Sequence, residues 1–294
     1  ETLDDAHALV VVLHGGGINA DLALTTLNTV EWLDIADEHG ALILAPDGLP
    51  GVQGLPQRLT WNDGRADNTT VSTADDVGFI NALLDWAEAN YTDVDTGRVY
   101  VVGASNGGMM AWRLAQELSD RIAAIGMNVA YKPAVDAGDD PEHPLSVVMF
   151  AGDADPQMPW NGGLVGGRPA AGTVLSATAT RDYFIDLFNC MPSAAETVAY
   201  PNTTADDGPS HVTSELYTGG DDGAEVMFYH IHNGGHIQPS VEYAIDPDPA
   251  TIGNENRDLS GVRHTWAFFQ DKTLHGANDA PAAPCESKSQ SAPL

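Results

Sequence analysis

Along most of the chain, short apolar runs alternate with longer segments whose apolar residues recur at helical spacing. The short runs have the composition of buried strands, and the longer segments have the period of amphipathic helices. Strands are predicted at 8–13, 41–45, 98–103, 122–129, 146–151 and 226–231. Helices are predicted at 22–39, from Thr73 or Asp75 to Asn90, and at 106–118, 175–188 and 259–269. This alternation predicts βαβ units around a mostly parallel sheet.

The first two predicted helices carry the apolar residues Leu24, Leu27, Trp32, Leu33 and Ile35, and Val77, Ile80, Leu83, Leu84 and Trp86, as candidate core contacts. Residues 196–200 and 211–217 alternate between apolar and polar positions, which predicts a short antiparallel hairpin insertion. Residues 157–173 are rich in glycine and proline and are expected to form a mobile loop over the site. We expect one catalytic domain over residues 1–275 and an irregular C-terminal tail at 276–294.

A strand-to-helix turn carries the most informative motif of the chain. The run before residue 103 ends in Gly103-Ala104-Ser105-Asn106-Gly107, and a helical segment follows at once. This pattern is typical of a nucleophile elbow, in which a sharp turn lifts the serine hydroxyl above the sheet. The two glycines leave room for the close backbone approach, and the helix N-terminus points N–H groups at developing negative charge. Ser105 is therefore the predicted nucleophile.

A glycine-rich loop, His14-Gly15-Gly16-Gly17, follows the first predicted strand. The N–H group of Gly16 or Gly17 is expected to form one half of an oxyanion hole, and the N–H group of Asn106 the other half. His14 is expected to be a buried residue that is hydrogen-bonded to the backbone and fixes this loop.

A serine nucleophile needs a base and an acid that orients the base. His236 follows the last predicted strand after a short Gly-Gly loop and is the predicted base, with His230, His232 and His14 as rivals. Asp155 is preferred over Asp153 as the acid, since Asp153 also suits a residue that only stabilises the turn. The resulting order Ser, Asp, His is the one expected of an α/β-hydrolase.

Two tryptophans lie in predicted loops near the expected mouth of the site. Trp61 and Trp160 offer flat apolar area to an acyl or aryl group, and core packing is the alternative role for each. The chain contains neither H-E-x-x-H nor C-x-x-C. We therefore predict no metal site, and the proposed chemistry needs no cofactor.

The charge balance narrows the set of partners. The 294 residues include 42 acidic and 12 basic residues, which gives a formal net charge of −30. Because like charges repel, nucleic acid and anionic membranes are poor partners. No apolar run is long enough to span a membrane. A saline habitat and simple solubility are alternative reasons for the acidic surface. We expect a secreted monomer, although no leader is visible and further N-terminal strands are expected for this fold.

Six motifs together resemble the polyhydroxybutyrate depolymerase and feruloyl esterase-like family of α/β-hydrolases. They are Leu13-His14-Gly15-Gly16-Gly17-Ile18-Asn19-Ala20, Ala45-Pro46-Asp47-Gly48, Asp75-Asp76-Val77-Gly78-Phe79, Gly103-Ala104-Ser105-Asn106-Gly107-Gly108-Met109, Gly152-Asp153-Ala154-Asp155-Pro156 and Gly234-Gly235-His236. The resemblance implies Ser105 as nucleophile, Asp155 as acid and His236 as base.

The chain departs from the family pattern at Ala151, at Trp160 and at Ile237-Gln238, all of which flank the expected pocket. The family's helix-end cysteine matches Cys190, whose usual partner is absent. A disulfide from Cys190 to Cys285, the second cysteine, would be a substitute, and two free thiols are the alternative.

The sequence thus predicts a serine carboxylic-ester hydrolase acting through an acyl-enzyme. Feruloyl-type esters, hydroxyalkanoate oligomers and other small or polymeric esters are the candidate substrates. An acyltransferase, or a catalytically silent ligand-binding protein on the same scaffold, is the alternative.

Overall fold

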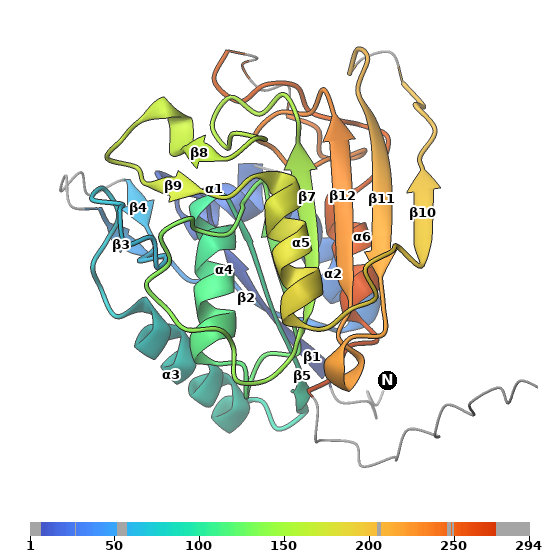
Figure 1. The fold of residues 1–294 in the computed structure, drawn as a ribbon. Coiled ribbons are helices and arrows are strands. Elements are labelled where there is room, and N and C mark those ends of the chain that lie inside the picture. The colour runs from blue at the N-terminus through green and yellow to red at the C-terminus, as the bar shows by residue number, and fades with distance from the viewer. Residues whose placement is uncertain are drawn as a thin grey trace, which may run out of the picture.

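An eight-stranded sheet forms the centre of the computed structural model (Figure 1). The structure describes residues 7–26, 28–51, 58–204, 207–245, 248 and 250–274. In spatial order the strands are β10 (Glu196–Ala199), β11 (His211–Tyr217), β12 (Val226–His232), β7 (Ser146–Gly152), β6 (Ala124–Asn128), β5 (Val94–Ala104), β1 (His7–Leu13) and β2 (Leu42–Leu44). The six strands from β12 to β2 are parallel, and β10 and β11 pair antiparallel at one edge. This is the mostly parallel sheet with a short antiparallel hairpin that the sequence predicted.

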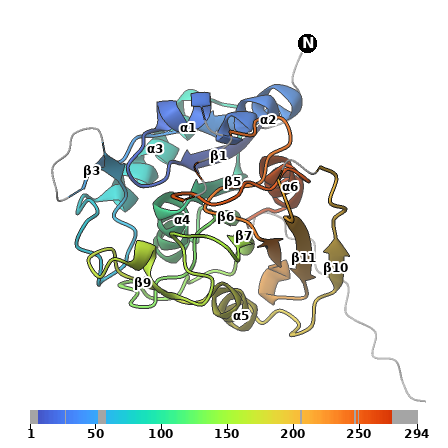
Figure 2. The ribbon, with the colours of Figure 1, turned by 90° about the horizontal axis from the view of Figure 1, so that it is seen from above.

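Helices cover both faces of this sheet (Figure 2). One face carries α3 (Asp76–Asn90), α4 (Asn106–Glu117) and α5 (Ala177–Leu187), and the other carries α2 (Glu31–His39) and α6 (Gly261–Phe269). The short α1 (Ala20–Thr26) precedes α2. The loops contain short antiparallel strand pairs and 3-10 turns. The strand pairs are β3 (Leu49–Pro50) with β4 (Leu59–Thr60) and β8 (Gly163–Leu164) with β9 (Thr173–Val174), and the turns are η1 (Asn28–Val30), η2 (Val165–Gly167) and η3 (Asp221–Gly223).

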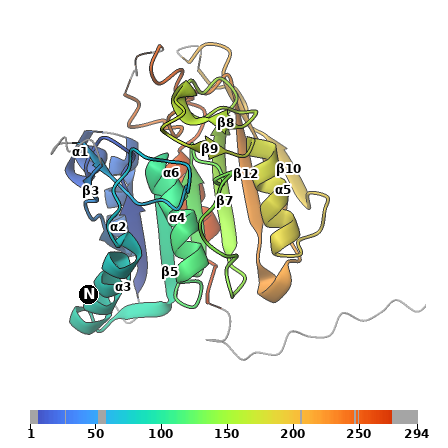
Figure 3. The same ribbon diagram turned by 60° about the vertical axis from the view of Figure 1, so that its left-hand side comes forward.

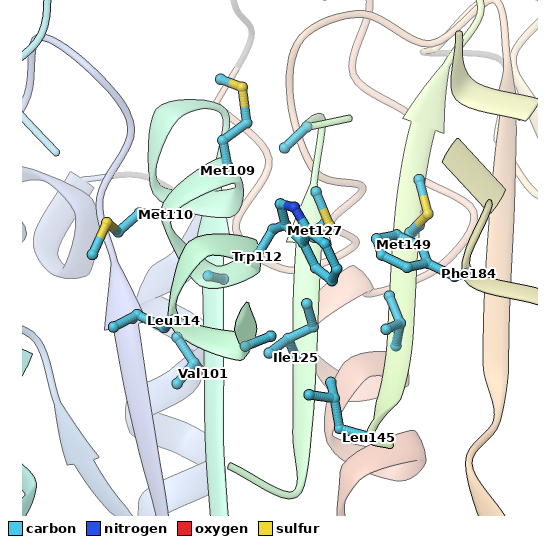
Figure 4. Close-up of a cluster of buried hydrophobic side chains, with 14 of the residues drawn as sticks. Val101, Met109, Met110, Trp112, Leu114, Ile125, Met127, Leu145, Met149 and Phe184 are labelled. Atoms are coloured by element: carbon cyan, nitrogen blue, oxygen red, sulfur yellow. The ribbon is translucent and has the colours of Figure 1, made fainter. Parts of the chain in front are cut away.

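Apolar side chains fill the space between the sheet and α4. Trp112 and Met110 of α4 are fully buried. In the view of Figure 4, Trp112 lies between Met110 and Met149, with Val101 and Ile125 below it. Residues of successive parallel strands thus form a continuous apolar surface on which the helix after Ser105 rests. This packing holds the helix N-terminus against the end of β5.

The predicted helix over 22–39 is wrong as a single element. The chain forms α1, the 3-10 turn η1 and then α2. Thr29 Oγ1 donates to the carbonyl of Ala23 at 2.6 Å, and the side-chain amide of Asn28 bonds to the carbonyl of Gln238. Such side-chain bonds to backbone compete with helix propagation. Within α2, Trp32 and Ile35 lie three residues apart on one face and are buried, while Leu33 is 43% exposed. Leu27 lies outside the described residues.

The helix predicted from Thr73 or Asp75 to Asn90 begins at Asp76. Asp75 is its N-cap, and its carboxylate accepts a hydrogen bond from the N–H of Gly78 at 2.9 Å. Val77, Ile80 and Leu84 face the core. Trp86, which the sequence also assigned to that side, is 49% exposed and stacks edge-on against Tyr91.

The segment between β7 and α5 lies at the end of the sheet toward which β7 and β12 point. Figures 1 and 3 show β8 and β9 at this level. Carboxyl ends of parallel strands are where α/β folds place their ligands. No helix among the described residues is long and apolar enough to cross a membrane. Cys190 is buried, and Cys285 and the predicted tail lie outside the described residues.

Candidate active site

Ser105 occupies a strained turn between β5 and α4. Its backbone has φ 54° and ψ −119°, a conformation that residues with a side chain rarely adopt. The N–H of Ser105 donates to the carbonyl of Asn128 at 2.8 Å, which ties the turn to the neighbouring strand. This is the strand–turn–helix context that a nucleophile elbow requires.

The glycines around Ser105 permit this turn. A Cβ atom at Gly103 would lie 2.3 Å from the backbone of Gly107, and one at Gly107 would lie 2.5 Å from the carbonyl oxygens of Leu13 and His14. Both distances are far below van der Waals contact. The sequence predicted this close approach, and the structure shows that the partner at the second glycine is the end of β1.

The glycine loop after β1 lies beside the elbow. A Cβ at Gly16 would come within 3.3 Å of the Asn106 Cβ. The N–H of Gly17 already donates to the carbonyl of Leu59 at 2.7 Å, whereas the N–H of Gly16 has no hydrogen-bond partner among the described residues. The geometry therefore favours Gly16 over Gly17 as a donor to an incoming oxyanion.

A buried polar network holds Asn106 in place, and the sequence analysis missed it. The side-chain amide of Asn106 donates to Asp63 Oδ2 at 2.6 Å and accepts from the N–H of Trp61 at 2.7 Å. The fully buried Asp63 carboxylate also pairs with the Arg65 guanidinium at 2.6 Å. The only signal in the sequence was the composition of the segment Trp61-Asn62-Asp63-Gly64-Arg65, which does not identify a contact with residue 106.

His14 fixes the oxyanion loop as expected. Its Nδ1 donates to the carbonyl of Gly15 at 2.8 Å, and its Nε2 accepts from the N–H of Gly48 at 3.0 Å. Burial lowers the pKa of this histidine, against smaller raising effects of Gly15 and Asp47. A neutral ring with this tautomer satisfies both backbone groups.

Asp155 and His236 meet at the carboxyl ends of β7 and β12. Asp155 Oδ2 lies 2.7 Å from His236 Nδ1, and both side chains are buried, with exposures of 0% and 8%. Asp155 Oδ1 accepts from the N–H groups of Gln157 and Met158, each at 2.7 Å. The N–H of His236 donates to the carbonyl of Ile252 at 2.5 Å. Both side chains are therefore fixed by their own backbone surroundings.

The alternative candidates for the acid and the base, Asp153, His230 and His232, interact with one another and not with Asp155 or His236. Asp153 Oδ2 lies 3.0 Å from His230 Nε2 and 3.7 Å from His232 Nδ1, and Asp153 Oδ1 accepts from the N–H of Asn233 at 2.7 Å. The sequence named these residues as alternatives to Asp155 and His236, and the fold separates the two sets.

A cavity opens at Ser105. Its walls include Gly16, Asn106 and Met109 on one side and Gln157, Val165 and Arg168 of the 157–173 segment on the other. The segment predicted to cover the site thus contributes to the same cavity as the predicted nucleophile. No hydrogen bond joins Ser105 to His236 within the described part of the chain.

Trp61 and Trp160, the two tryptophans predicted to bind substrate, differ in burial and in contacts. Trp61 is fully buried, and its indole N–H donates to the carbonyl of His14 at 2.9 Å. It has the core-packing role that the sequence left as the alternative, because no face of the ring reaches solvent. Trp160 is partly buried and stacks on His230 with ring centroids 4.2 Å apart.

Comparison with curated proteins finds esterases. The chain is 28% identical over 269 residues to "Putative esterase NocK" of Nocardia uniformis subsp. tsuyamanensis, covering 88% of this chain and 72% of that protein. It is 31% identical over 142 residues to a poly(3-hydroxybutyrate) depolymerase of Ralstonia pickettii, covering 45% and 27% of the two chains. It is 28% identical over 205 residues to feruloyl esterase B of Piromyces equi, covering 68% and 34%. The chain thus spans about a third or less of the latter two proteins.

Comparison with solved structures identifies the fold. An acetyl xylan esterase from Aspergillus awamori superposes with a TM-score of 0.51 at 13% identity, covering 79% of this chain and 84% of that one. No family model matches the chain. The chain has the α/β-hydrolase fold. It is related to esterases that include a polyhydroxybutyrate depolymerase and a feruloyl esterase, which confirms the resemblance seen in its motifs. These relatives support the prediction that the chain is a carboxylic ester hydrolase.

Proposed function

We propose that this protein hydrolyses carboxylic esters with Ser105 as nucleophile, His236 as general base and Asp155 as the acid that orients the base. The strained turn at Ser105 carries the proposal, because it opens into a cavity that Gly16 and Asn106 also line. Strain at a residue with a reactive side chain is a property of functional sites. The bond between Asp155 and His236 adds a positioned base.

The chemistry follows from these positions. Ser105 Oγ attacks the ester carbonyl while His236 Nε2 takes the hydroxyl proton, and Asp155 stabilises the resulting imidazolium through Nδ1. The N–H groups of Gly16 and Asn106 stabilise the oxyanion of the tetrahedral intermediate. His236 then gives its proton to the leaving alcohol. Water, activated by the same base, cleaves the acyl-enzyme and restores Ser105.

The relatives suggest the range of substrates to examine. Their names include a poly(3-hydroxybutyrate) depolymerase and a feruloyl esterase, so hydroxyalkanoate oligomers, feruloyl esters and other polyesters are the substrates that we propose. Secretion, which the sequence analysis expected, stays a prediction.

Labelling with a fluorophosphonate, combined with turnover of 4-nitrophenyl esters, tests the proposal. Wild-type protein should gain one phosphonyl group by intact mass and should release 4-nitrophenol. Ser105→Ala should lose both properties while retaining its melting temperature, because removal of one hydroxyl leaves no large cavity. Ser193→Ala, which alters an exposed serine, is the matched control.

Near-native turnover by Ser105→Ala would overturn the assignment of the nucleophile. Absence of turnover and labelling in the wild type would favour the silent binding protein. Release of ester product in place of acid when an alcohol is added would favour the acyltransferase.

A further inference from the structure

A second cluster of ionisable side chains lies next to the acid turn, outside the proposed triad. Asp153 follows β7 directly, and His230 and His232 are alternate residues of β12, so both imidazoles project from the same face of the sheet. β12 and β7 are adjacent parallel strands (Figure 1). The three side chains therefore converge at the carboxyl ends of two neighbouring strands.

The spacing of the three groups suits a metal ion. One ligand atom from each residue, Asp153 Oδ2, His230 Nε2 and His232 Nδ1, lies within 4.8 Å of the others. The carboxylate oxygen is 3.0 Å from the first nitrogen and 3.7 Å from the second. Ligands of a tetrahedral Zn²⁺ with bonds of about 2.05 Å stand about 3.3 Å apart. The two carboxylate–nitrogen distances lie on either side of this value, and the two nitrogens are within 4.8 Å of one another.

Neighbouring residues hold both imidazole rings in orientation. His232 Nε2 lies 3.1 Å from Thr213 Oγ1, so Nδ1 of the same ring faces the carboxylate. His232 stacks on His211 with ring centroids 4.1 Å apart, and His230 stacks on Trp160 at 4.2 Å. Hydrogen bonds that fix the tautomer of a metal-binding histidine are a recurrent feature of metal sites.

The three side chains are also accessible to an ion. Their exposed fractions lie between 23% and 31%, so a metal ion can reach them from solvent.

We propose that Asp153, His230 and His232 bind a divalent transition-metal ion of the Zn²⁺ type, with water completing the coordination. Two imidazoles and one carboxylate favour Zn²⁺, Co²⁺ or Ni²⁺ over Ca²⁺ and Mg²⁺, which prefer oxygen ligands. The ion would join β12 to the turn that begins two residues before Asp155. Its role is to brace the acid turn, and it takes no part in the ester chemistry. The sequence analysis predicted no metal because Asp153 lies 77 residues before His230 in the chain and the three residues match no motif.

Titration with Co²⁺ tests this site independently of activity. Tag-free protein is used because a histidine tag binds the same ions, and millimolar Ca²⁺ is added to occupy the acidic surface. One equivalent of Co²⁺ should bind, give visible d–d absorption bands, and be displaced by Zn²⁺. His232→Gln and Asp153→Asn should each weaken Co²⁺ binding at least about 100-fold, since even loss of residues that only support metal ligands costs 10–100-fold.

His143→Gln, which removes an exposed histidine outside the cluster, should bind Co²⁺ as the wild type does. Wild-type protein should also melt at a higher temperature with saturating Co²⁺ than with a chelator, and this shift should be lost in His232→Gln. Equal Co²⁺ binding by all variants, or no stoichiometric binding by the wild type in the presence of Ca²⁺, would overturn the proposal.

The cavity at Ser105 supports a second inference, which rests on the proposed function. Three arginines line this cavity, namely Arg58, Arg65 and Arg168, in a chain with 12 basic and 42 acidic residues. The guanidinium of Arg65 is paired with Asp63. Arg58 and Arg168 are exposed, and neither forms an ion pair with another described residue. Positive charge without a local partner is thus gathered at the cavity of a strongly acidic protein.

We infer that the ester substrate carries a carboxylate, which Arg168 and Arg58 bind at the mouth of the cavity. Guanidinium groups bind carboxylates with two parallel hydrogen bonds, and a local positive field counteracts the repulsion that a net charge of −30 exerts on an anion. An oligomer with a free acid end has this chemistry, whereas a neutral short-chain ester does not.

The mono-4-nitrophenyl ester of glutaric acid and its methyl-capped diester form a matched pair of anionic and neutral probes. Wild-type kcat/KM should be higher for the anionic ester, and added salt should reduce the difference. Arg168→Gln should lower kcat/KM about tenfold for the anionic ester only, as expected for loss of a charged contact. Arg98→Gln, which alters an arginine outside the cavity, is the control.

Binding of both esters to the Ser105→Ala variant by calorimetry supplies a readout that needs no turnover. Equal affinity for the two esters, or equal loss of both in Arg168→Gln, would overturn the inference about charge. Absence of hydrolysis of either ester by the wild type would instead overturn the proposed activity, and the binding comparison would still decide the substrate charge.

Discussion

Replacement of Asp63 by asparagine tests how much the buried Asp63 charge stabilises the network that positions Asn106 beside Ser105. The Asp63 carboxylate is fully buried and contacts two residues, Arg65 and Asn106. The Arg65 side chain is only 4% exposed, so its charge has little access to water once the carboxylate is gone. An isosteric amide removes the negative charge and keeps the shape, which isolates the electrostatic contribution.

The magnitude follows from the burial of the pair. Breaking a buried ion pair by removing one partner typically costs about 3–5 kcal/mol, because an uncompensated charge stays buried. We expect Asp63→Asn to lower the free energy of unfolding by that amount, measured by urea denaturation with tryptophan fluorescence. The exposed pair of Arg113 and Glu117 supplies the control, since Glu117→Gln should cost below about 1 kcal/mol.

A double-mutant cycle completes this test. Asp63→Leu with Arg65→Met removes both charges, and it should recover part of the loss because two apolar side chains of similar volume leave no buried charge unpaired. A loss below about 1 kcal/mol in Asp63→Asn would refute the reasoning, as would a double variant less stable than the sum of its single variants. Reduced kcat with retained folding would show that the network also orients the N–H of Asn106.

Three further predictions concern the site. Asp155→Asn should lower kcat by about 10⁴-fold and Asp153→Asn much less, and the reverse order in a 4-nitrophenyl ester assay would move the acid to Asp153. Gly107→Ala should severely reduce soluble yield and melting temperature, because the new Cβ would lie 2.5 Å from the carbonyl oxygens of Leu13 and His14; a normal melting temperature would contradict the tight contact. Because burial depresses the pKa of His14 below its unfolded value of 6.5, its stabilising effect is present above that pH and is lost as the pH falls. Denaturation at several pH values between 7 and 5 should show this loss, and His14→Gln should show a shallower dependence.

The parts of the fold that were predictable are those with local signals. The strand before Ser105 and the glycines of the elbow each leave a mark within a few residues, so period and composition were sufficient. The same local signals left Thr73 and Asp75 as alternative caps, and the structure has Asp75. The helix over 22–39 was not predictable in detail because its break depends on Asn28, whose amide bonds to the carbonyl of Gln238, far away in sequence. Exposure of Trp86 likewise depends on what packs against α3.

In the candidate site, too, features with local sequence signals were predictable and features that depend on distant contacts were not. Motifs indicated the elbow and the two loops that carry Asp155 and His236, but they could not separate Gly16 from Gly17 as the proposed donor, because the Gly17 N–H bonds to the carbonyl of Leu59. The Asp63 network and the cluster of Asp153 with His230 and His232 were also missed. Each joins segments from different strands or loops, and a single sequence holds no record of such contacts.

The Asp155–His236 pair has a consequence for refolding kinetics. Asp155 and His236 are 81 residues apart in the chain, and the segment between them contains α5, β10, β11 and β12, so their contact closes a long loop of chain. Closing such a loop is entropically expensive and slows the formation of the contacts that depend on it. Recovery of esterase activity after dilution from denaturant must therefore wait for β12 to dock beside β7. Regain of helical circular dichroism, which needs only local contacts, will precede it, and the interval between the two signals measures the time this docking takes.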